Sequence, residues 1–409
     1  MRIVMCNEFF YLRGGAERYM FDLMELFIRH GHEVIPFSMY APQNNPTHHG
    51  KYFVSNIDFP ALLKSRNFID MVRAIPRPLY SIEARKSLFR LLQDTKPDVV
   101  HVFNFAHYLS ISILDAIKHN SIPVVQSLLD YKWLCPNTTF LSNGEVCERC
   151  RNRRFYQAIL RRCKRNSLSA SFLASIQAYL SALTYADDKI KLFICHSRYL
   201  CGKMVEYGYP SEKFRYVSHF LDVDSYPNSD TSEPVAVYFG RFSYEKGLQT
   251  LLRAAEISGV TVALIGSGPD EEALKLHVRE HGLNNVHFLG PKWGQEMRDV
   301  VSKARCVVCP SEWYENSPLV VYEAMAMAKP VIGANIGGIP ELVQDQITGL
   351  VFRPGDSDDL AAKMRFLIDH PDIARRWGAE ARRVAKDKFK PQKHYKDVLS
   401  VYKDARNLA

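Results

Sequence analysis

The chain has 409 residues and a mass of 46.9 kDa, which suits two domains of about 200 residues better than one. Hydrophobic residues make up 47% and charged residues 24% of the sequence, a globular composition that excludes a disordered or fibrous chain. The net charge is +9, and between Arg149 and Ala186 there are eight Lys and Arg residues and no acidic residue, which indicates an anionic partner or a solvated helix face.

The first half of the sequence alternates short apolar runs with helical segments. After the first predicted strand come a loop with Gly14 and Gly15 and a helix from about Ala16 to Arg29. The predicted strands are short, rich in β-branched residues and bounded by loop residues, as in a buried parallel sheet; they are Ile3–Cys6, Glu33–Phe37, Asp98–Val102, Ile122–Gln126 and Leu192–Cys195. This alternation predicts an α/β, doubly wound domain at residues 1–225.

A basic segment with four cysteines, at about 131–186, interrupts this alternation. Cys147 and Cys150 form a CxxC, and Cys135 and Cys163 flank it. The spacing predicts a structural zinc site of four thiolates, with free thiols, a disulfide or an iron–sulfur site as alternatives. The chain has nine cysteines and no evident secretory signal, since the apolar run at its start is short, so we expect a reduced, cytoplasmic protein.

The end of this segment, Asn166–Ala186, contains no charged residue. Its 21 residues include five serines, which makes it a poor candidate for a membrane span and a better one for an amphipathic helix. One face of that helix repeats every four residues, at Leu168, Phe172, Ile176 and Leu180. We expect this face to pack on protein or to touch a membrane surface.

The second half repeats the alternation after a polar, proline-containing stretch, so we place a second domain at 226–409. Its strands are predicted at Val235–Phe239, Val260–Ile265, Val286–Leu289, Cys306–Cys309 and Val331–Gly333. Helices are expected at Gly247–Ser258 and Asp270–His281, and a last helix at about 391–408 is expected to return to the first domain. The sequence therefore predicts two doubly wound, Rossmann-like domains that face each other across a cleft. Ligands of such sheets bind at the carboxyl ends of the strands.

Two glutamates near the second predicted cleft edge, Glu315 and Glu323, stand eight residues apart. Glu315 precedes a predicted helix that contains Glu323, and the helix start offers backbone N–H groups at Asn316, Ser317 and Leu319 to an anion or a sugar oxygen. Carboxylates in this position can accept hydrogen bonds from sugar hydroxyls. The alternative is that both acids only stabilise the helix start.

Glycines and cations supply the rest of the predicted site. Gly240 and Arg241 end one strand, and Lys246 precedes a predicted helix, so the two cations can hold a diphosphate without a metal. Glycine-rich loops allow close approach of the backbone to phosphates, and the sequence places them at Gly14, Gly15, Gly266 and Gly268.

Together these motifs, with Pro310-Ser311, Gly337-Gly338-Ile-Pro-Glu341 and Thr348-Gly-Leu350, resemble retaining glycosyltransferase family 4, which has the GT-B fold. The resemblance covers nearly the whole chain. It implies that Arg241 and Lys246 bind the donor diphosphate, that Glu323 holds the nucleotide ribose, and that Glu315 contacts the transferred sugar. It also implies displacement of a nucleoside diphosphate with retained configuration and no cofactor required for catalysis. The segment with the four cysteines resembles an insertion found in a subset of these enzymes, on the acceptor side.

One position departs from the family pattern. Family members often carry a histidine before Asp130, where this chain has Leu129, whose side chain cannot form a hydrogen bond. His101, Asn104 and Asp130 are candidates to supply the missing group, although His101 is equally readable as a core histidine. The departure leaves open a catalytically weak or silent paralogue that binds nucleotide-sugars.

The expected function is transfer of a hexose from a nucleoside-diphosphate sugar to a lipid-linked or polysaccharide acceptor in cell-surface assembly. We expect a cytoplasmic protein, peripheral on the inner face of a membrane through the basic patch Arg149–Arg165. Two other classes are weighed against it: a different GT-B enzyme, such as a nucleotide-sugar epimerase, and a basic zinc-containing protein that binds nucleic acid. A cleft with phosphate loops is unnecessary for nucleic-acid binding, so no nucleic acid is expected as a partner.

Overall fold

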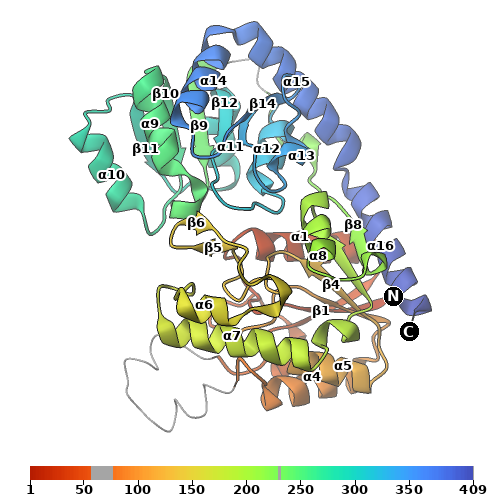
Figure 1. The fold of residues 1–409 in the computed structure, drawn as a ribbon. Coiled ribbons are helices and arrows are strands. Elements are labelled where there is room, and N and C mark those ends of the chain that lie inside the picture. The colour runs from red at the N-terminus through yellow and green to blue at the C-terminus, as the bar shows by residue number, and fades with distance from the viewer. Residues whose placement is uncertain (57–76, 229–231, 409) are drawn as a thin grey trace.

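A computed structural model describes residues 1–56, 77–228 and 232–408 of the chain. It contains two six-stranded parallel sheets, one in each half. Figure 1 shows the two halves, with the first in red to green and the second in green to blue. The first has the order β2-β1-β3-β4-β7-β8. Its strands are β1 Arg2–Cys6, β2 Glu33–Phe37, β3 Val99–Val102, β4 Val124–Leu128, β7 Leu192–Cys195 and β8 Phe214–Tyr216. All of its strand pairs are parallel.

The second sheet has the order β11-β10-β9-β12-β13-β14 and is also parallel throughout. Its strands are β9 Glu233–Phe239, β10 Thr261–Ile265, β11 Val286–Gly290, β12 Ala304–Cys309, β13 Val331–Ala334 and β14 Gly349–Phe352. The central strands are buried on both faces, which explains why the sequence reads as continuous apolar runs rather than alternating ones. The predicted fold of two doubly wound α/β domains is confirmed.

Helices connect the strands and cover the sheets. In the first domain these are α1 Gly15–Arg29, α4 Ile82–Thr95, α5 Ser112–His119, α6 Tyr156–Leu160, α7 Leu168–Leu183 and α8 Arg198–Glu206. In the second they are α9 Leu248–Ser258, α10 Glu271–Glu280, α11 Gly294–Lys303, α12 Leu319–Ala326, α13 Ile339–Leu342 and α14 Ser357–Asp369. The face of α1 that includes Tyr19, Leu23 and Phe27 is buried at helical spacing against the first sheet.

Two helices at the end of the sequence return the chain to the first domain. Helix α15, Pro371–Lys388, runs beside the second domain, and α16, Pro391–Asn407, continues along the first, as the blue segment of Figure 1 shows. Val398, Val401 and Tyr402 are buried in the same apolar cluster as Ile3 and Phe27. The core of the first domain is therefore built from both ends of the described chain.

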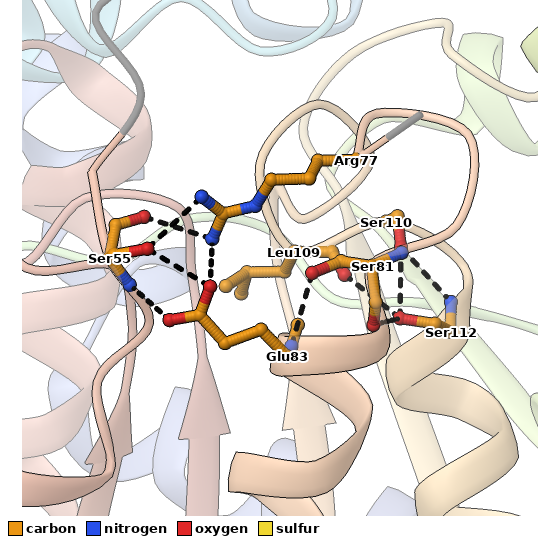
Figure 2. A network of polar contacts seen from close by, with 8 residues as sticks. Ser55, Arg77, Ser81, Glu83, Leu109, Ser110 and Ser112 are labelled. Carbon is orange, nitrogen blue, oxygen red and sulfur yellow. Dashed lines mark hydrogen bonds and ion pairs between the residues drawn. The ribbon is translucent and has the colours of Figure 1, made fainter. Parts of the chain in front are cut away.

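The start of α4 is fixed by polar contacts shown in Figure 2. The Ser81 hydroxyl accepts a hydrogen bond from the Ala84 backbone N–H and so caps the helix. Glu83, in the first turn, accepts hydrogen bonds from Ser55 and forms an ion pair with Arg77. These contacts join the segment before residue 57 to the segment after residue 76.

The basic segment between β4 and β7 forms a small hairpin and two helices. The hairpin pairs β5, Leu141–Ser142, with β6, Glu145–Val146, and α6 packs beside α7 through Phe155, Ala158 and Ala178. Within the described part of the chain, no helix has the length and apolarity needed to cross a bilayer.

Candidate functional site

The glycine loop of the first domain meets the helix start of the second. Gly15 is the first residue of α1, and a Cβ atom added to it would lie 3.4 Å from Leu319 Cδ1. Leu319 in turn is the first residue of α12, so both helix starts face the space between the two domains. Each leaves backbone N–H groups without intrahelical partners, an arrangement that favours an anion.

Glu315 lies in the loop before α12 and is held by a cation and a hydroxyl. Its Oε1 is 2.7 Å from Lys246 Nζ and accepts a 2.7 Å hydrogen bond from Ser311 Oγ. The side chain of Glu315 is nearly buried. Burial alone would raise the pKa of this carboxyl, but the Lys246 ammonium and the hydrogen bonds hold it below its ordinary value. Burial also disfavours the charged form of Lys246, but the neighbouring Glu315 carboxylate raises the pKa of Lys246 above its ordinary value.

Glu323, inside α12, meets a residue from the opposite domain. Arg18 of α1 places its guanidinium 2.8 Å from Glu323 Oε1 and donates a second hydrogen bond, of 3.0 Å, to Tyr226 Oη. The Tyr226 hydroxyl donates to the same carboxylate at 3.2 Å. Glu323 therefore accepts hydrogen bonds from a cation and a phenol, and it is a carboxylate that ribose hydroxyls can bind by replacing those donors.

Asn316 links the two domains directly. Its amide nitrogen donates to the Leu128 carbonyl at the end of β4, at 2.9 Å, and its amide oxygen accepts from Ser197 Oγ at 2.7 Å. Ser317 is engaged within its own domain, where its hydroxyl lies 2.8 Å from Tyr322 Oη. The predicted donor loop thus touches the end of β4, next to Leu129 and Asp130.

Close backbone contacts explain several of the predicted glycines. Gly266 has φ +140°, and a Cβ there would lie 1.9 Å from the Gly240 carbonyl oxygen. At Gly268 a Cβ would lie 2.1 Å from the Phe242 carbonyl oxygen. These loops follow β9 and β10, and Arg241 between them is exposed, with its backbone carbonyl accepting from Tyr238 Oη at 2.8 Å.

The loop after β13 holds the Glu315 backbone in place. Gly337 has φ +60°, and a Cβ there would lie 2.3 Å from the Glu315 carbonyl oxygen. The Gly338 N–H donates a 2.7 Å hydrogen bond to that same oxygen. Farther along, the Glu341 carboxylate accepts hydrogen bonds from the backbone N–H groups of Arg198 and Tyr199 at the start of α8, across the domain boundary.

Asp130 borders a cavity of about 380 Å³ in the first domain. Glu8, His107 and Lys132 also line it, and the aromatic side chains of Phe105 and Trp133 form part of its wall. Burial raises the pKa of Glu8 to about 7 and also raises that of Asp130. Burial, with the neighbouring Lys164 ammonium, lowers the pKa of Lys132 to about 8. The loops after β1, β3 and β4 therefore place several titratable groups around a cavity whose lining comes from the first domain.

His101 lies apart from these residues. Its ring is fully buried, with Nδ1 2.7 Å from Tyr402 Oη and Nε2 2.9 Å from Ser127 Oγ. Burial lowers the pKa of His101 well below its ordinary value, so the ring is neutral. The structure thus places His101 under α16 as a hydrogen-bonded core residue, while Asp130 borders the cavity.

The structure does not support the predicted zinc site. Among the described residues, no group of three or more His, Cys, Asp or Glu side chains is placed to hold a metal ion, the set Cys135, Cys147, Cys150 and Cys163 included. Cys150 packs in an apolar cluster, and Cys163 donates to Ser142 Oγ at 3.4 Å. Burial raises the pKa of Cys135 and Cys163, and that of Cys150 to about 12.

Sequence reasoning missed the residues by which the basic segment reaches the second domain. Gly144 lies against Tyr244, and the Glu148 carboxylate accepts a 2.7 Å hydrogen bond from Tyr314 Oη beside Glu315. It also missed Arg18 and Tyr226. The position of Arg18, three residues after Gly15 on a predicted helix, was the one available signal.

Two family models match the chain. Residues 13–130 match Glycosyltransferase Family 4, and residues 224–384 match Glycosyl transferases group 1. The O-antigen chain mannosyltransferase C of Escherichia coli is 32% identical over 155 residues, which cover 37% of this chain and 42% of that protein. The chain thus spans less than half the length of this curated relative.

Solved structures share the whole fold at low sequence identity. HepE of Anabaena, crystallised with UDP, is 18% identical with a TM-score of 0.70 and covers 99% of this chain and 100% of its own. Sucrose-phosphate synthase of Thermosynechococcus elongatus is 17% identical with a TM-score of 0.74 and covers 100% of both chains. By its two matched regions and its fold, the chain belongs to the GT-B glycosyltransferases of the family 4 and group 1 type.

Proposed function

We propose that the protein is a retaining glycosyltransferase that moves a hexose from a nucleoside-diphosphate sugar to an acceptor used in cell-surface polysaccharide or glycolipid assembly. The observation that carries the proposal is the convergence of Gly15 from one domain with Lys246, Glu315, Leu319 and Glu323 from the other. These groups offer two helix starts, one cation and two carboxylates within one interdomain space.

In this proposal the donor diphosphate binds at the start of α12, facing Gly15. Lys246 and Arg241 neutralise the charge that builds on the leaving diphosphate, which lowers the barrier to breaking the sugar–phosphate bond. Glu323 accepts hydrogen bonds from the ribose and Glu315 from the hexose, which fixes the reacting carbon relative to the acceptor. HepE, a structural neighbour, was crystallised with UDP-glucose, which supports a nucleotide-sugar as the donor.

The acceptor side is proposed to be the cavity beside Asp130. Its carboxylates can accept hydrogen bonds from acceptor hydroxyls, and Lys132 can contact a phosphate. The name of the Escherichia coli relative, an O-antigen chain mannosyltransferase, supports a surface polysaccharide context. We propose that the protein works in the cytoplasm, at the inner face of a membrane where lipid-linked acceptors are found.

The test is a thermal-shift panel with UDP, GDP, ADP, dTDP and CDP, since a ligand that binds only the folded protein raises the melting temperature. We expect one nucleotide to stabilise the wild type and to lose at least about tenfold in affinity in Glu323→Ala. Glu272→Ala is the control, because Glu272 is an exposed carboxylate on α10. Equal shifts in both variants would remove the ribose assignment.

Transfer is then measured with sugars carried on the nucleotide that binds, and the configuration of the product is read by NMR. We expect an α-linked product from an α-linked donor. Lys246→Ala should lose most of the transfer rate while nucleotide binding falls less, because the clamp acts on the leaving group. Binding without transfer from any donor would favour a silent nucleotide-sugar-binding protein instead.

A further inference from the structure

Helix α7 turns its apolar face outward. The residues it buries are small or polar, namely Ser171, Ala174, Ser175, Gln177 and Ala178. Gln177 explains part of this choice, because its amide bonds the Lys132 ammonium and the Pro78 carbonyl beneath the helix. The helix is thus attached to the domain by its polar side, which is the reverse of an ordinary surface helix.

Next to this buried face, α7 carries a stripe of large apolar residues. At 3.6 residues per turn, Leu168, Phe172 and Leu183 fall within about 60° of one another. Their exposed fractions are 54%, 53% and 75%. Of the periodic set predicted from the sequence, only Leu180 packs against the core cluster. The helical period was therefore predicted correctly, but of the four predicted positions Leu168 and Phe172 are exposed and Ile176 is partly buried.

The surroundings of the stripe are apolar and basic. Seven of the twenty large hydrophobic side chains exposed in the described chain lie between Val146 and Tyr185. At the turn that joins α6 to α7, Leu160 is 72% exposed, and Arg162 and Arg165 are exposed beside it. The sequence has no acidic residue from Arg149 to Ala186. The two helices lie on the outside of the first domain (Figure 1).

We propose that this α6–α7 surface, defined as Leu160, Leu168, Phe172 and Leu183 with Arg162 and Arg165, docks on an anionic lipid bilayer. The stripe enters the boundary between headgroups and acyl chains while the arginines contact lipid phosphates. Charge complementarity favours this occupant over a protein of mixed charge. The apolar stripe favours it over nucleic acid, which arginines alone would bind. The proposal deepens the membrane location proposed above, and its test is separate from the test of transfer because docking involves none of the interdomain residues.

Vesicle flotation with the full chain tests the surface in the absence of donor and acceptor. We expect binding to vesicles of phosphatidylcholine with phosphatidylglycerol and at least about tenfold weaker binding to phosphatidylcholine alone. The double variant Phe172→Ser/Leu183→Ser should lose at least about tenfold in affinity for the anionic vesicles. Arg162→Glu/Arg165→Glu should lose as much and respond less to salt. Because all four side chains are exposed, the melting temperature should stay near that of the wild type.

The matched controls lie on the second domain. Ile257→Ser/Leu276→Ser removes two apolar side chains of similar exposure from α9 and α10, and Arg375→Glu/Arg376→Glu reverses two exposed charges on α15. Both should bind vesicles as the wild type does. The proposal is overturned if the wild type ignores anionic vesicles, or if the serine variant binds them unchanged. Retention on duplex DNA or RNA in place of vesicles would also overturn it.

Discussion

Lys246 and Glu315 carry opposite charges in a largely buried position, so each offsets the free-energy cost of burying the other's charge. The Lys246 side chain is 24% exposed and that of Glu315 is 7% exposed. Taking either partner away leaves the other charge with poor solvation. A comparable pair joins Arg18 to Glu323 across the interdomain space. The charged groups that we propose for donor binding are therefore held in internal ion pairs in this structure.

The Lys246–Glu315 pair can be measured by a double-mutant cycle. Glu315→Gln should lower the free energy of unfolding by about 2 kcal/mol, and Lys246→Met by a similar amount. The double variant should recover part of the loss, because no charge is then left unpaired. Chemical unfolding at pH 7 measures all four proteins, and strictly additive losses would show that the pair is not coupled.

The pH dependence of the same pair has a definite sign. Because the pKa of Glu315 is lowered by folding, its contribution is present above its ordinary pKa of 4.5 and is lost as the pH falls through the lowered value. Because the pKa of Lys246 is raised, its contribution is complete below 10.5 and is lost as the pH rises through the raised value. The coupling measured by the cycle should therefore vanish at both extremes.

Glu8 should change stability with pH in the direction opposite to Glu315. Burial raises its pKa from 4.5 to about 7, so the folded state keeps a proton that the unfolded state has released. Stability should fall as the pH rises through that window, by about 2–3 kcal/mol in total. Glu8→Gln should flatten the profile, while Glu25→Gln, a change at an exposed residue of α1, should leave it unchanged. An unchanged profile in Glu8→Gln would contradict the assignment.

At the level of residues, the sequence predicted the motifs but not the contacts between distant segments. Glu315, Glu323 and Lys246 could be named because their spacing resembles a family pattern. Arg18 could not, because it meets Glu323 across 305 positions and only the folded arrangement of two domains reveals the pair. For His101 the sequence left two interpretations open, a role in chemistry or a place in the core. The structure shows a buried ring that is hydrogen-bonded to Tyr402.

At the scale of elements, the loop after β13 acts as a brace for the loop before α12. Gly337 combines a left-handed backbone with a close approach to the Glu315 backbone, whereas Gly355 has φ +76° and no atom within 4 Å of an added Cβ. The two glycines differ in contact and share a left-handed backbone conformation, which would strain any residue with a Cβ atom.

Substituting each glycine by alanine separates the cost of backbone strain from the cost of steric contact. Gly355→Ala should cost about 1 kcal/mol, the price of a left-handed alanine alone. Gly337→Ala should cost at least about twice as much, because the loop must shift away from Glu315. Transfer should fall sharply in Gly337→Ala only. Equal stability and activity in the two variants would show that the brace is unimportant; denaturant unfolding and the transfer assay measure both effects.

Most strands of the two sheets were predicted, but β8 and β14, each at the edge of its sheet, were not. The prediction Leu192–Cys195 coincides with β7, and Val235–Phe239 falls within β9. Strand β8, Phe214–Tyr216, is three residues long, includes an arginine and lies at the sheet edge, so its sequence carries little signal. In α7 the period predicted the helix, but which face is buried depends on partners such as Gln177 and Lys132.

At the scale of the whole molecule, α16 joins the two domains by packing on the first. Tyr402 and Tyr395 both lie on this helix and both bond a histidine of the first domain. Tyr402 Oη is 2.7 Å from His101 Nδ1 in the core, and Tyr395 Oη is 2.8 Å from His32 Nε2 in a partly exposed position. The same kind of tyrosine–histidine hydrogen bond thus occurs once in the core and once in a partly exposed position.

The two tyrosines make a matched comparison. Tyr402→Phe should lower the free energy of unfolding by about 1–3 kcal/mol, because a buried ring nitrogen of His101 loses its partner. Tyr395→Phe should cost less than about 1 kcal/mol, because water can replace the hydroxyl. Thermal and denaturant unfolding check both values. Equal losses would indicate that α16 is not held by its buried polar contact.

The position of α16 also has a consequence for the order of folding during synthesis. Ile3 and Phe27 are translated long before α16, yet the apolar cluster they share with Val401, Tyr402 and Ala405 is incomplete until the helix beginning at Pro391 has been translated. The second domain draws its core cluster from residues 221–389 and can close earlier. The first domain is therefore synthesised first but completes its core last. Until α16 has been translated, the apolar surface that this helix covers stays exposed while the second domain folds.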